Sequence, residues 1–284
     1  MKTALVLEGG GMRGAYTCGV LDSLMEKNIT FDAVIGVSAG ACHACSYISK
    51  QRGRAFRTCS LWLHDKRYMS LDSLFKTGDL FNAQFIYHDI PDKLDPYDYK
   101  TFNNSSTKLW VTCTDCQTGK PLYFPIAHIQ EDIEYVRASA SLPLISNIVE
   151  YNGYQMLDGG LSDSIPFEFM MNKGYDKIVV ILTREKGYKK EENKAMPLIR
   201  TIYKNHPAII HACKTRHKHY NEELKQLDQL EKEGEIFSLY PSELHVGRLE
   251  KDPNKLRELY QTGIKDIQSK EKELLHYLNN EVTQ

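Results

Sequence analysis

The chain has 284 residues, of which 42% are hydrophobic, and its formal net charge is −1 at pH 7. This length allows one large domain or a domain with an appendage, and the balanced charge gives no overall field that would favour nucleic acid as a partner. No run approaches the roughly 18 apolar residues of a membrane span, and the first residues lack the apolar core of a signal peptide. With seven cysteines, an odd number, we expect a cytoplasmic protein with reduced thiols.

The N-terminal part alternates apolar strands with helical patterns. Residues 3–7 form a continuous apolar run, which is typical of a strand buried on both faces. A glycine run and a helical pattern follow, and residues 31–35 form the next apolar run, with a second helical pattern after Ser38. This strand–helix–strand–helix order predicts an α/β fold with a mainly parallel sheet and helices on its faces.

The segment from residue 61 to about residue 106 is rich in aromatic side chains without one clean period. We expect short helices and loops that form a cap over a site, although the same rings could instead complete the core of the domain. The aromatic residues are Trp62, Tyr68, Phe75, Phe81, Phe85, Tyr87, Tyr97, Tyr99 and Phe102, and they alternate with the basic Lys66, Arg67 and Lys76.

The remaining elements are clearest where apolar runs return. Strands are predicted at residues 108–113, 122–124, 154–157, 177–182 and 236–240, and helices at residues 133–140, before residue 232, and at 254–278. A polar linker at residues 186–194 divides the chain. We therefore predict a catalytic domain at 1–185 and a mostly helical region at 186–284, with one extra strand near 236–240, that packs on the core.

The sequence GVSAG at residues 36–40 places a serine between strand and helix. The pattern G-x-S-x-G in this context is that of a nucleophile elbow, a sharp turn that exposes the serine oxygen. Small neighbours permit such a turn, and here they are Gly36, Val37, Ala39 and Gly40. Ser38 is therefore the candidate nucleophile, and it needs a base beside it.

The glycine run GGGMRG after the first strand has two interpretations. Gly9, Gly11 and Gly14 fit a dinucleotide-binding G-x-G-x-x-G loop, but no acidic residue follows at the end of the second strand to bind a ribose. Alternatively, backbone amides of Gly9 to Gly14, with Gly10, Met12 and Arg13 between them, form an oxyanion hole beside Ser38. A purely structural turn would need fewer glycines, and Arg13 either adds positive charge near the site or covers a helix end.

The base is harder to find from the residues alone. None of the ten histidines lies in a Gly- or Asp-rich turn after a clear strand, and His43 lies on the helix behind Ser38. The remaining candidate is Asp158, which ends a strand and precedes Gly159 and Gly160. A plain Asp-Gly turn would give the same pattern. The two CxxC pairs lie in different settings, so that we expect no metal site.

Three ordered motifs resemble those of the patatin-like phospholipase family: GGGMRG at residues 9–14, GVSAG at 36–40 and DGG at 158–160. Two flanking stretches, ASASLPLIS from Ala138 and DGGLSDSIP to Pro166, extend the resemblance over roughly the first 185 residues. The resemblance implies a three-layer α/β/α fold. It covers the region after about Lys186 poorly, and there we expect a helical C-terminal elaboration. It also implies a Ser–Asp dyad without histidine, in which Ser38 is the nucleophile, Asp158 the base and the glycine loop the oxyanion hole.

We therefore expect a serine acyl hydrolase that cleaves fatty-acyl esters without a cofactor, with a lipid substrate and peripheral contact with a membrane through the cap. Asp158 would need partial burial to act as base, because an ordinary aspartate has a pKa of roughly 3.9. Three alternatives are a Ser–His–Asp α/β-hydrolase, a nucleotide-binding oxidoreductase that uses the glycine loop, and a non-enzymatic regulator. The elbow comes too early in the chain for the α/β-hydrolase, and no acidic residue is placed to bind the ribose of a nucleotide. The reactive residue types are all retained, which counts against a regulator without activity.

Overall fold

The structure of the protein is a computed structural model that describes residues 1–279, and its centre is an eight-stranded sheet. The strands are β1 (Thr3–Leu7), β2 (Ala33–Val37), β3 (Lys108–Asp115), β4 (Pro121–Ile126), β5 (Val149–Tyr151), β6 (Tyr154–Asp158), β7 (Lys177–Ile181) and β8 (Ile236–Leu239). Their order is β5-β6-β3-β2-β1-β7-β8, and β4 pairs with β3. The five strands from β3 to β8 in this order are parallel, whereas β4, β5 and β6 run antiparallel to their neighbours.

Helices connect and cover these strands. The α-helices are α1 (Ala15–Glu26), α2 (Ala39–Ile48), α3 (Arg54–Ser60), α4 (Leu71–Thr77), α5 (Tyr99–Asn103), α6 (Ile129–Ser139), α7 (Phe167–Asn172), α8 (Met196–Ile202), α9 (Pro207–Lys232), α10 (Pro253–Ser269) and α11 (Glu271–Asn279). Short 3-10 turns form η1 (Gly11–Gly14) and η3 (Gly159–Leu161), and η2 (Phe85–Leu94) is a π-helix. None of the helices within residues 1–279 combines the length and apolar composition that crossing a membrane requires.

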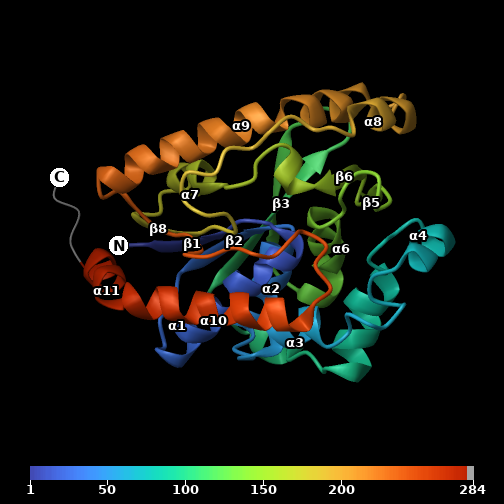
Figure 1. The fold of residues 1–284 in the computed structure, drawn as a ribbon. Helices are drawn as coiled ribbons and strands as arrows, with labels where there is room; N and C mark the ends of the chain where they lie inside the picture. Colours follow the sequence, from blue (N-terminus) through green and yellow to red (C-terminus); the bar gives the residue numbers. More distant parts are fainter. Residues whose placement is uncertain (280–284) are drawn as a thin grey trace.

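The two faces of the sheet are buried under different helices, which gives three layers (Figure 1). Alternate residues of β1 point to opposite faces: Leu5 and Leu7 pack with residues of α1, α2 and α10, whereas Ala4 and Val6 pack with residues of α7 and α9. Side chains alternate in this way along any strand, so a strand that is apolar at every position must be covered twice. The predicted three-layer α/β/α fold with a mainly parallel sheet is confirmed.

The C-terminal part is built into this framework. Strand β8 extends the sheet beyond β7, in parallel register, close to where a strand is expected. Helix α10 packs along α1, where added Cβ atoms at Gly19 and Gly263 would collide with the carbonyl oxygens of Tyr260 and Tyr16. The mostly helical character of this part agrees with expectation. The division of the chain at residues 185 and 186 stays a prediction.

Several predicted boundaries are wrong by a few residues. The second strand spans Ala33–Val37 rather than residues 31–35, because the Asp32 side chain accepts hydrogen bonds from the Thr3 amide and hydroxyl at 2.7 and 3.0 Å and precedes the pairing region. The helix expected at 254–278 is two helices, α10 and α11, which separate at Lys270. Strand β5 and helix α7 are additional elements that the apolar pattern did not indicate.

Candidate active site

Ser38 lies in a sharp turn between β2 and α2, as the GVSAG motif predicts. Its backbone has φ 56° and ψ −125°, a left-handed region that is unfavourable for a residue with a side chain. The Ser38 amide donates a 2.9 Å hydrogen bond to Ser139 Oγ, whose hydroxyl in turn donates to the Thr112 carbonyl at 2.7 Å. Strain held by such bonds is typical of a nucleophile elbow.

Close packing explains the two elbow glycines. An added Cβ at Gly36 would lie 2.5 Å from Ala41 on the first turn of α2, and one at Gly40 would collide with the Leu7 carbonyl at the end of β1. Contacts this short leave no room for a side chain. The elbow is therefore pressed against the neighbouring strand β1, which leads directly into the glycine loop.

The glycine loop lies beside the elbow because β1 and β2 are adjacent parallel strands. An added Cβ at Gly9 would lie 2.6 Å from Ser38 Cβ, and one at Gly10 would lie 2.6 Å from Thr183 Oγ1. Gly11 has φ +57°, and a Cβ added there would lie 2.6 Å from the Arg248 carbonyl oxygen. Each of the three glycines thus permits a close approach that any other residue would prevent.

The amides of this loop differ in whether they are already engaged. The Met12 amide donates to the Arg248 carbonyl at 3.0 Å, and the Arg13 amide donates to the Gly10 carbonyl at 3.3 Å. The amides of Gly9, Gly10 and Gly11 donate to no group within residues 1–279. The three free donors therefore belong to glycines that line the same small pocket as Ser38, an arrangement that suits the stabilisation of a developing oxyanion.

Asp158 ends β6 and is fully buried behind Ser38. Its Oδ1 accepts a 2.8 Å hydrogen bond from the Gly160 amide, and its own amide donates to the Ser141 carbonyl at 2.8 Å. Its Oδ2 is buried and has no hydrogen-bond partner in the described part of the chain. Oδ1 thus holds the carboxylate in place, and Oδ2 is free to accept a proton.

Burial raises the pKa of Asp158 above the ordinary aspartate value. Arg216, the Ser38 hydroxyl, the Gly160 amide and Arg248 act in the opposite direction, in decreasing order. The Ser38 hydroxyl is therefore near enough to influence the pKa of Asp158, although no hydrogen bond joins the two side chains in this arrangement. A buried carboxylate with a raised pKa is a stronger base than an exposed one.

A small pocket brings most of the predicted site residues together. Its walls include Gly9, Gly10, Gly11, Arg13, Val37, Ser38, Asp158 and Gly160. Met12 and Ala39 instead line a larger cavity next to it, and Gly14 faces the ring of His43. Gly159 packs against the Thr112 carbonyl, and so it serves the turn rather than the pocket wall.

The larger cavity has a volume of about 260 Å³ and opens beside Ser38. Gly11, Ser38 and Leu142 line both this cavity and the small pocket, so that Ser38 lies where the two spaces meet. The walls of the large cavity are mainly apolar, and many come from the segment predicted as a cap: Tyr68, Phe81, Ile86, Tyr87, Ile90, Pro91, Tyr97 and Tyr99.

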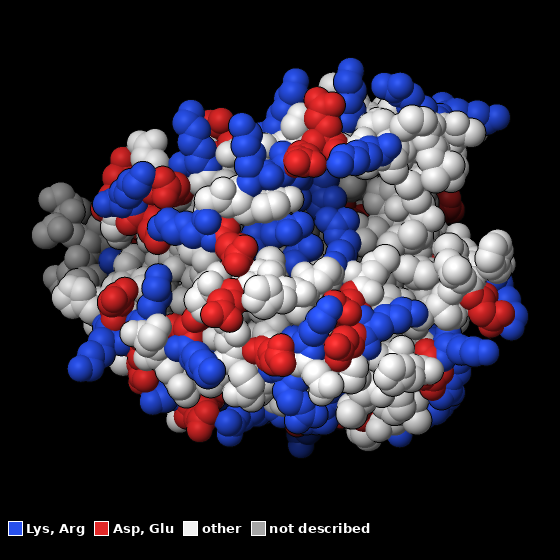
Figure 2. Space-filling model, viewed as in Figure 1, with Lys and Arg blue, Asp and Glu red and all other residues white. Residues whose placement is uncertain are grey.

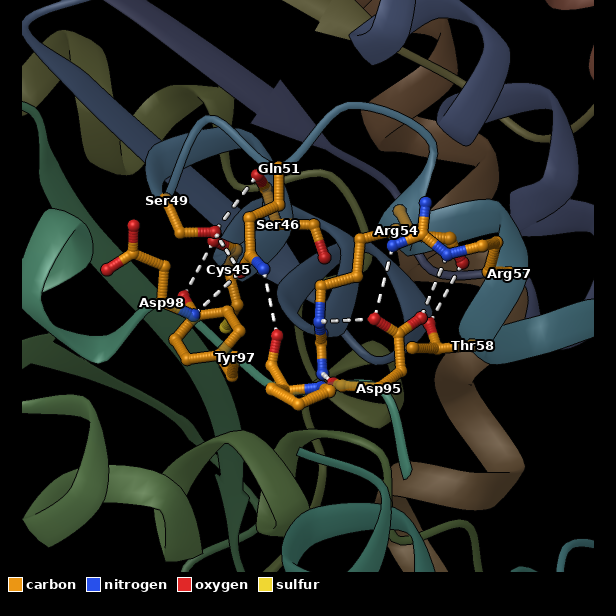
Figure 3. Close-up of polar contacts among 12 residues, drawn as sticks. Cys45, Ser46, Ser49, Gln51, Arg54, Arg57, Thr58, Asp95, Tyr97 and Asp98 are labelled. Carbon is orange, nitrogen blue, oxygen red and sulfur yellow. Dashed lines mark hydrogen bonds and ion pairs between the residues drawn. The ribbon is translucent and has the colours of Figure 1, made fainter. Parts of the chain in front are cut away.

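Polar contacts fasten the cap segment to α2 and α3 (Figure 3). Arg57 forms a two-bonded ion pair with Asp95 at 3.0 and 3.1 Å, and Arg54 donates to the Asp95 carbonyl at 2.9 Å. The Tyr97 hydroxyl donates to the Cys45 carbonyl at 2.7 Å. Paired guanidinium–carboxylate bonds are directional, so these contacts fix the wall of the cavity that Arg54 and Tyr97 help to form.

Histidine has no comparable position in this site. His43 is buried in α2, its ring lies against Gly14, and burial lowers its pKa to about 4. No histidine lines the small pocket that holds Ser38 and Asp158. Among residues 1–279, no three His, Cys, Asp or Glu side chains are grouped so that they could hold a metal ion.

Other residues of the site carry no recognisable signal in the sequence. Glu8 accepts hydrogen bonds from Tyr220 at 2.7 Å and from the Thr183 amide at 2.7 Å, and so it ties the glycine loop to β7 and α9. Lys190, Arg216 and Arg248 line the small pocket from the far side. They come from charged segments far along the chain, where only the folded structure reveals them. Ser139, by contrast, lies in the quoted ASASLPLIS stretch.

The fold and the elbow define the protein as an α/β protein of the kind that carries a strained serine between a sheet strand and a helix. The chain belongs to the patatin-like phospholipase family, whose model matches residues 5–171. Residues 206–279 match a second family, a domain of unknown function named DUF6363.

Similar proteins come from bacteria and fungi. The uncharacterized protein YjjU of Escherichia coli K12 is 28% identical over 188 residues, which cover 64% of this chain and 52% of YjjU. Lysophospholipase NTE1 of Meyerozyma guilliermondii is 30% identical over 192 residues, 62% of this chain and 12% of that protein. The matched region is thus about half of YjjU and about an eighth of the fungal protein. The crystal structure of VipD from Legionella pneumophila superposes with a TM-score of 0.46 and 12% identity, covering 94% of this chain and 66% of that one.

Proposed function

We propose that the protein is a serine acyl hydrolase that cleaves fatty-acyl esters of lipids through a Ser38–Asp158 dyad. The observation that carries this proposal is the meeting of three features at one point: a strained serine, a buried carboxylate with a free oxygen, and three unengaged glycine amides. Membership of the patatin-like phospholipase family and the similarity to a fungal lysophospholipase support a lipid ester as substrate.

The reaction would proceed in two steps. Asp158 Oδ2 accepts the hydroxyl proton of Ser38 as the serine oxygen attacks the ester carbonyl, and the amides of Gly9, Gly10 and Gly11 donate to the oxyanion. The protonated Asp158 then gives its proton to the leaving alcohol, which leaves an acyl-serine. Water, activated by the same carboxylate, hydrolyses the acyl-serine and releases the fatty acid.

The large apolar cavity suits the acyl chain, since burying each CH₂ group contributes about 0.8 kcal/mol. The cap segment would also face lipid aggregates: Leu71 and Phe75 on α4 are 67% and 87% exposed and lie close to Lys76. Peripheral contact with a membrane surface and a cytoplasmic location remain part of this proposal.

The structure gives no support to two of the alternatives. A Ser–His–Asp triad would need a histidine between Ser38 and Asp158, and His43 faces Gly14 instead. A pyrophosphate would need several amides of η1, but within residues 1–279 only the Gly11 amide is free, since the Met12 and Arg13 amides donate to the carbonyls of Arg248 and Gly10. The reactive groups are all present, which also speaks against a purely regulatory role.

Hydrolysis of a panel of lysophospholipids and acylglycerols tests the proposal. Wild type should release fatty acid, and Ser38→Ala should lower turnover by up to roughly 10⁶-fold. Ser60→Ala, a serine outside both pockets, is the matched control and should retain activity. Turnover by Ser38→Ala that equals that of wild type, or no turnover of any ester by wild type, would contradict the proposal.

A further inference from the structure

Cationic side chains gather in the small pocket that meets the apolar cavity at Ser38. Lys190 in the loop after β7, Arg216 on α9 and Arg248 in the loop before α10 line the small pocket together with Arg13. Figure 2 shows Lys and Arg gathered in the hollow at the middle of this face, below α9. Lys190, Arg216 and Arg248 all lie outside residues 5–171, and two of them lie in the domain of unknown function.

No salt bridge joins these cations to a carboxylate in the described residues, although Arg216 and Arg248 are near enough to Asp158 to lower its pKa. Lys190, Arg216 and Arg248 take part in no ion pair within residues 1–279, although each is partly buried. The Nε atoms of Arg13 and Arg216 are buried without a hydrogen-bond partner. Cations this close to one another repel, and leaving them unpaired is costly unless an anion binds among them.

The acidic groups nearby offset this charge only in part. Glu8 and Asp158 line the small pocket together with Arg13, Lys190, Arg216 and Arg248, so that four basic side chains face two carboxylates there. Burial raises the pKa of the neighbouring Glu223 to about 8, which favours its neutral form. Burial and the nearby Arg216 lower the pKa of Lys190 to about 7. A bound anion would reverse that shift, because an opposite charge favours the protonated amine.

The side chains are also held in place. Lys190 lies 3.9 Å above the centre of the Tyr220 ring, and its backbone exchanges hydrogen bonds of 2.8 and 3.0 Å with the Asn221 side chain on α9. Arg216 Nη2 lies 3.0 Å from where an added Gly160 Cβ would be, beside the DGG turn, and the Arg248 side chain lies against Gly11. The cluster therefore begins within contact distance of both catalytic motifs.

We propose that Lys190, Arg216 and Arg248 form a subsite for a phosphate group of the substrate, and that this subsite favours acyl esters whose head group is a phosphate monoester. The inference rests on the proposed function, since it assigns the head-group side of the same site. Guanidinium groups match the geometry of phosphate oxygens. A phosphate monoester carries nearly two negative charges, which fits the excess of cations in this pocket better than a zwitterionic head group.

A binding experiment on the Ser38→Ala protein tests the subsite without turnover. The probes are 1-octanoylglycerol 3-phosphate and 1-octanoylglycerol, which differ only in the phosphate and are used below their aggregation concentrations. The phosphate-bearing probe should bind at least about tenfold more tightly, because a charge-assisted hydrogen bond contributes about tenfold to a hundredfold. Equal affinity for the two probes would overturn the inference.

Variants identify the residues in the same background. Lys190→Gln and Arg216→Gln should each lower the affinity ratio of the two probes about tenfold, and Lys190→Arg should retain it. Lys189→Gln removes an exposed neighbouring charge and should leave the ratio unchanged. Thermal unfolding confirms that each variant is folded. A ratio that Lys190→Gln and Arg216→Gln leave intact, or that Lys189→Gln lowers equally, would contradict the subsite.

Inorganic phosphate separates a head-group site from a site for the free ion. It should compete with 1-octanoylglycerol 3-phosphate and bind more weakly than it, because it lacks the acyl chain. Phosphate that binds as tightly as the lipid would overturn a substrate subsite. If the Ser38→Ala protein shows the binding preference and wild type cleaves no ester, the proposed function fails and the subsite stands. Cleavage without any phosphate preference gives the opposite result.

Discussion

At the residue scale, the buried carboxylate of Asp158 connects the proposed activity with stability. Burial raises the pKa of Asp158 in the folded protein above that of the unfolded chain. Holding Asp158 ionised at neutral pH therefore opposes folding, and this cost shrinks as the pH falls through the raised pKa and is gone below the pKa of an ordinary aspartate. A group that a protein retains at a cost to its stability is typical of a functional site.

Asp158→Asn should therefore lose activity and gain stability. Turnover should fall about 10²–10⁴-fold, because the amide cannot accept the Ser38 proton, while the melting temperature at pH 8 should rise. The gain should shrink as the pH is lowered toward the acid range, since wild-type Asp158 then becomes neutral as well. Melting curves across pH and ester kinetics measure both effects.

Asp163→Asn is the matched control for this prediction. Asp163 is another acidic residue, its pKa is raised to about 6 mainly by burial, and it accepts a hydrogen bond from Tyr123 at 2.6 Å outside the small pocket. The substitution should change the pH dependence of stability in the same direction and leave ester turnover largely intact. If Asp158→Asn retained full turnover, Asp158 would not be the base.

At the element scale, the glycine loop should be intolerant of even one methyl group. In Gly9→Ala the new Cβ would lie 2.6 Å from Ser38 Cβ, so that either the loop or the elbow must move. Turnover should fall about 10²–10³-fold, the effect of losing one oxyanion donor, and the protein should lose about 1–3 kcal/mol of stability.

Gly247→Ala provides the comparison, because Gly247 has nothing within 4 Å of an added Cβ and no left-handed backbone requirement. It should leave turnover and melting temperature nearly unchanged. Equal kinetics for Gly9→Ala and wild type in a folded protein would make the loop a structural turn rather than an oxyanion hole.

The cap segment is predicted to bind the acyl chain. The kcat/KM of wild type should rise with acyl length by up to about fourfold per CH₂ group until the cavity is filled. Ile86→Asn, which puts a polar group in the cavity wall, should weaken this gain, whereas Phe75→Asn, on the exposed surface of the same segment, should retain it for monomeric esters. Equal losses on short and long esters, with a lower melting temperature, would assign Ile86 to the core alone.

Local signals in the sequence predict the elements that hold the reactive residues. Ser38 and the Gly9–Gly11 run follow apolar strands that are parallel neighbours, which brings their turns to one edge of the sheet. Asp158 also follows an apolar strand, but β6 is antiparallel to β3, and Asp158 reaches this edge because it pairs with Cys113, next to the Thr112 partner of Val37. Lys190, Arg216 and Arg248 give no such signal, because they come from a loop, the middle of a long helix and another loop. Their meeting depends on how α9 and the C-terminal loops pack on the sheet, which no local pattern encodes.

At the scale of the whole molecule, residues after 185 complete both the core and the site. β8 pairs with β7, α10 covers α1, and the Tyr277 hydroxyl on α11 donates to the Glu235 carbonyl at 2.7 Å. A chain of residues 1–185 should therefore fail to unfold cooperatively, because it exposes the edge of β7 and the apolar faces under α9 and α10. Calorimetry and near-ultraviolet circular dichroism would show this.

A single substitution gives a milder version of the same test. Gly263→Leu should force α10 away from the Tyr16 carbonyl on α1 and lower the melting temperature by several degrees, without touching either pocket. A 1–185 fragment that melts cooperatively, together with a neutral Gly263→Leu, would make the C-terminal part an independent appendage.

Covalent labelling with a fluorophosphonate, located by mass spectrometry, tests the central claim most directly. We expect one label per chain, on Ser38, with slower labelling of Asp158→Asn and none at this position in Ser38→Ala. Replacing His43 with Gln should leave the labelled residue unchanged. A label on another residue, or undiminished labelling of the Ser38→Ala protein, would contradict the assignment of Ser38 as the nucleophile.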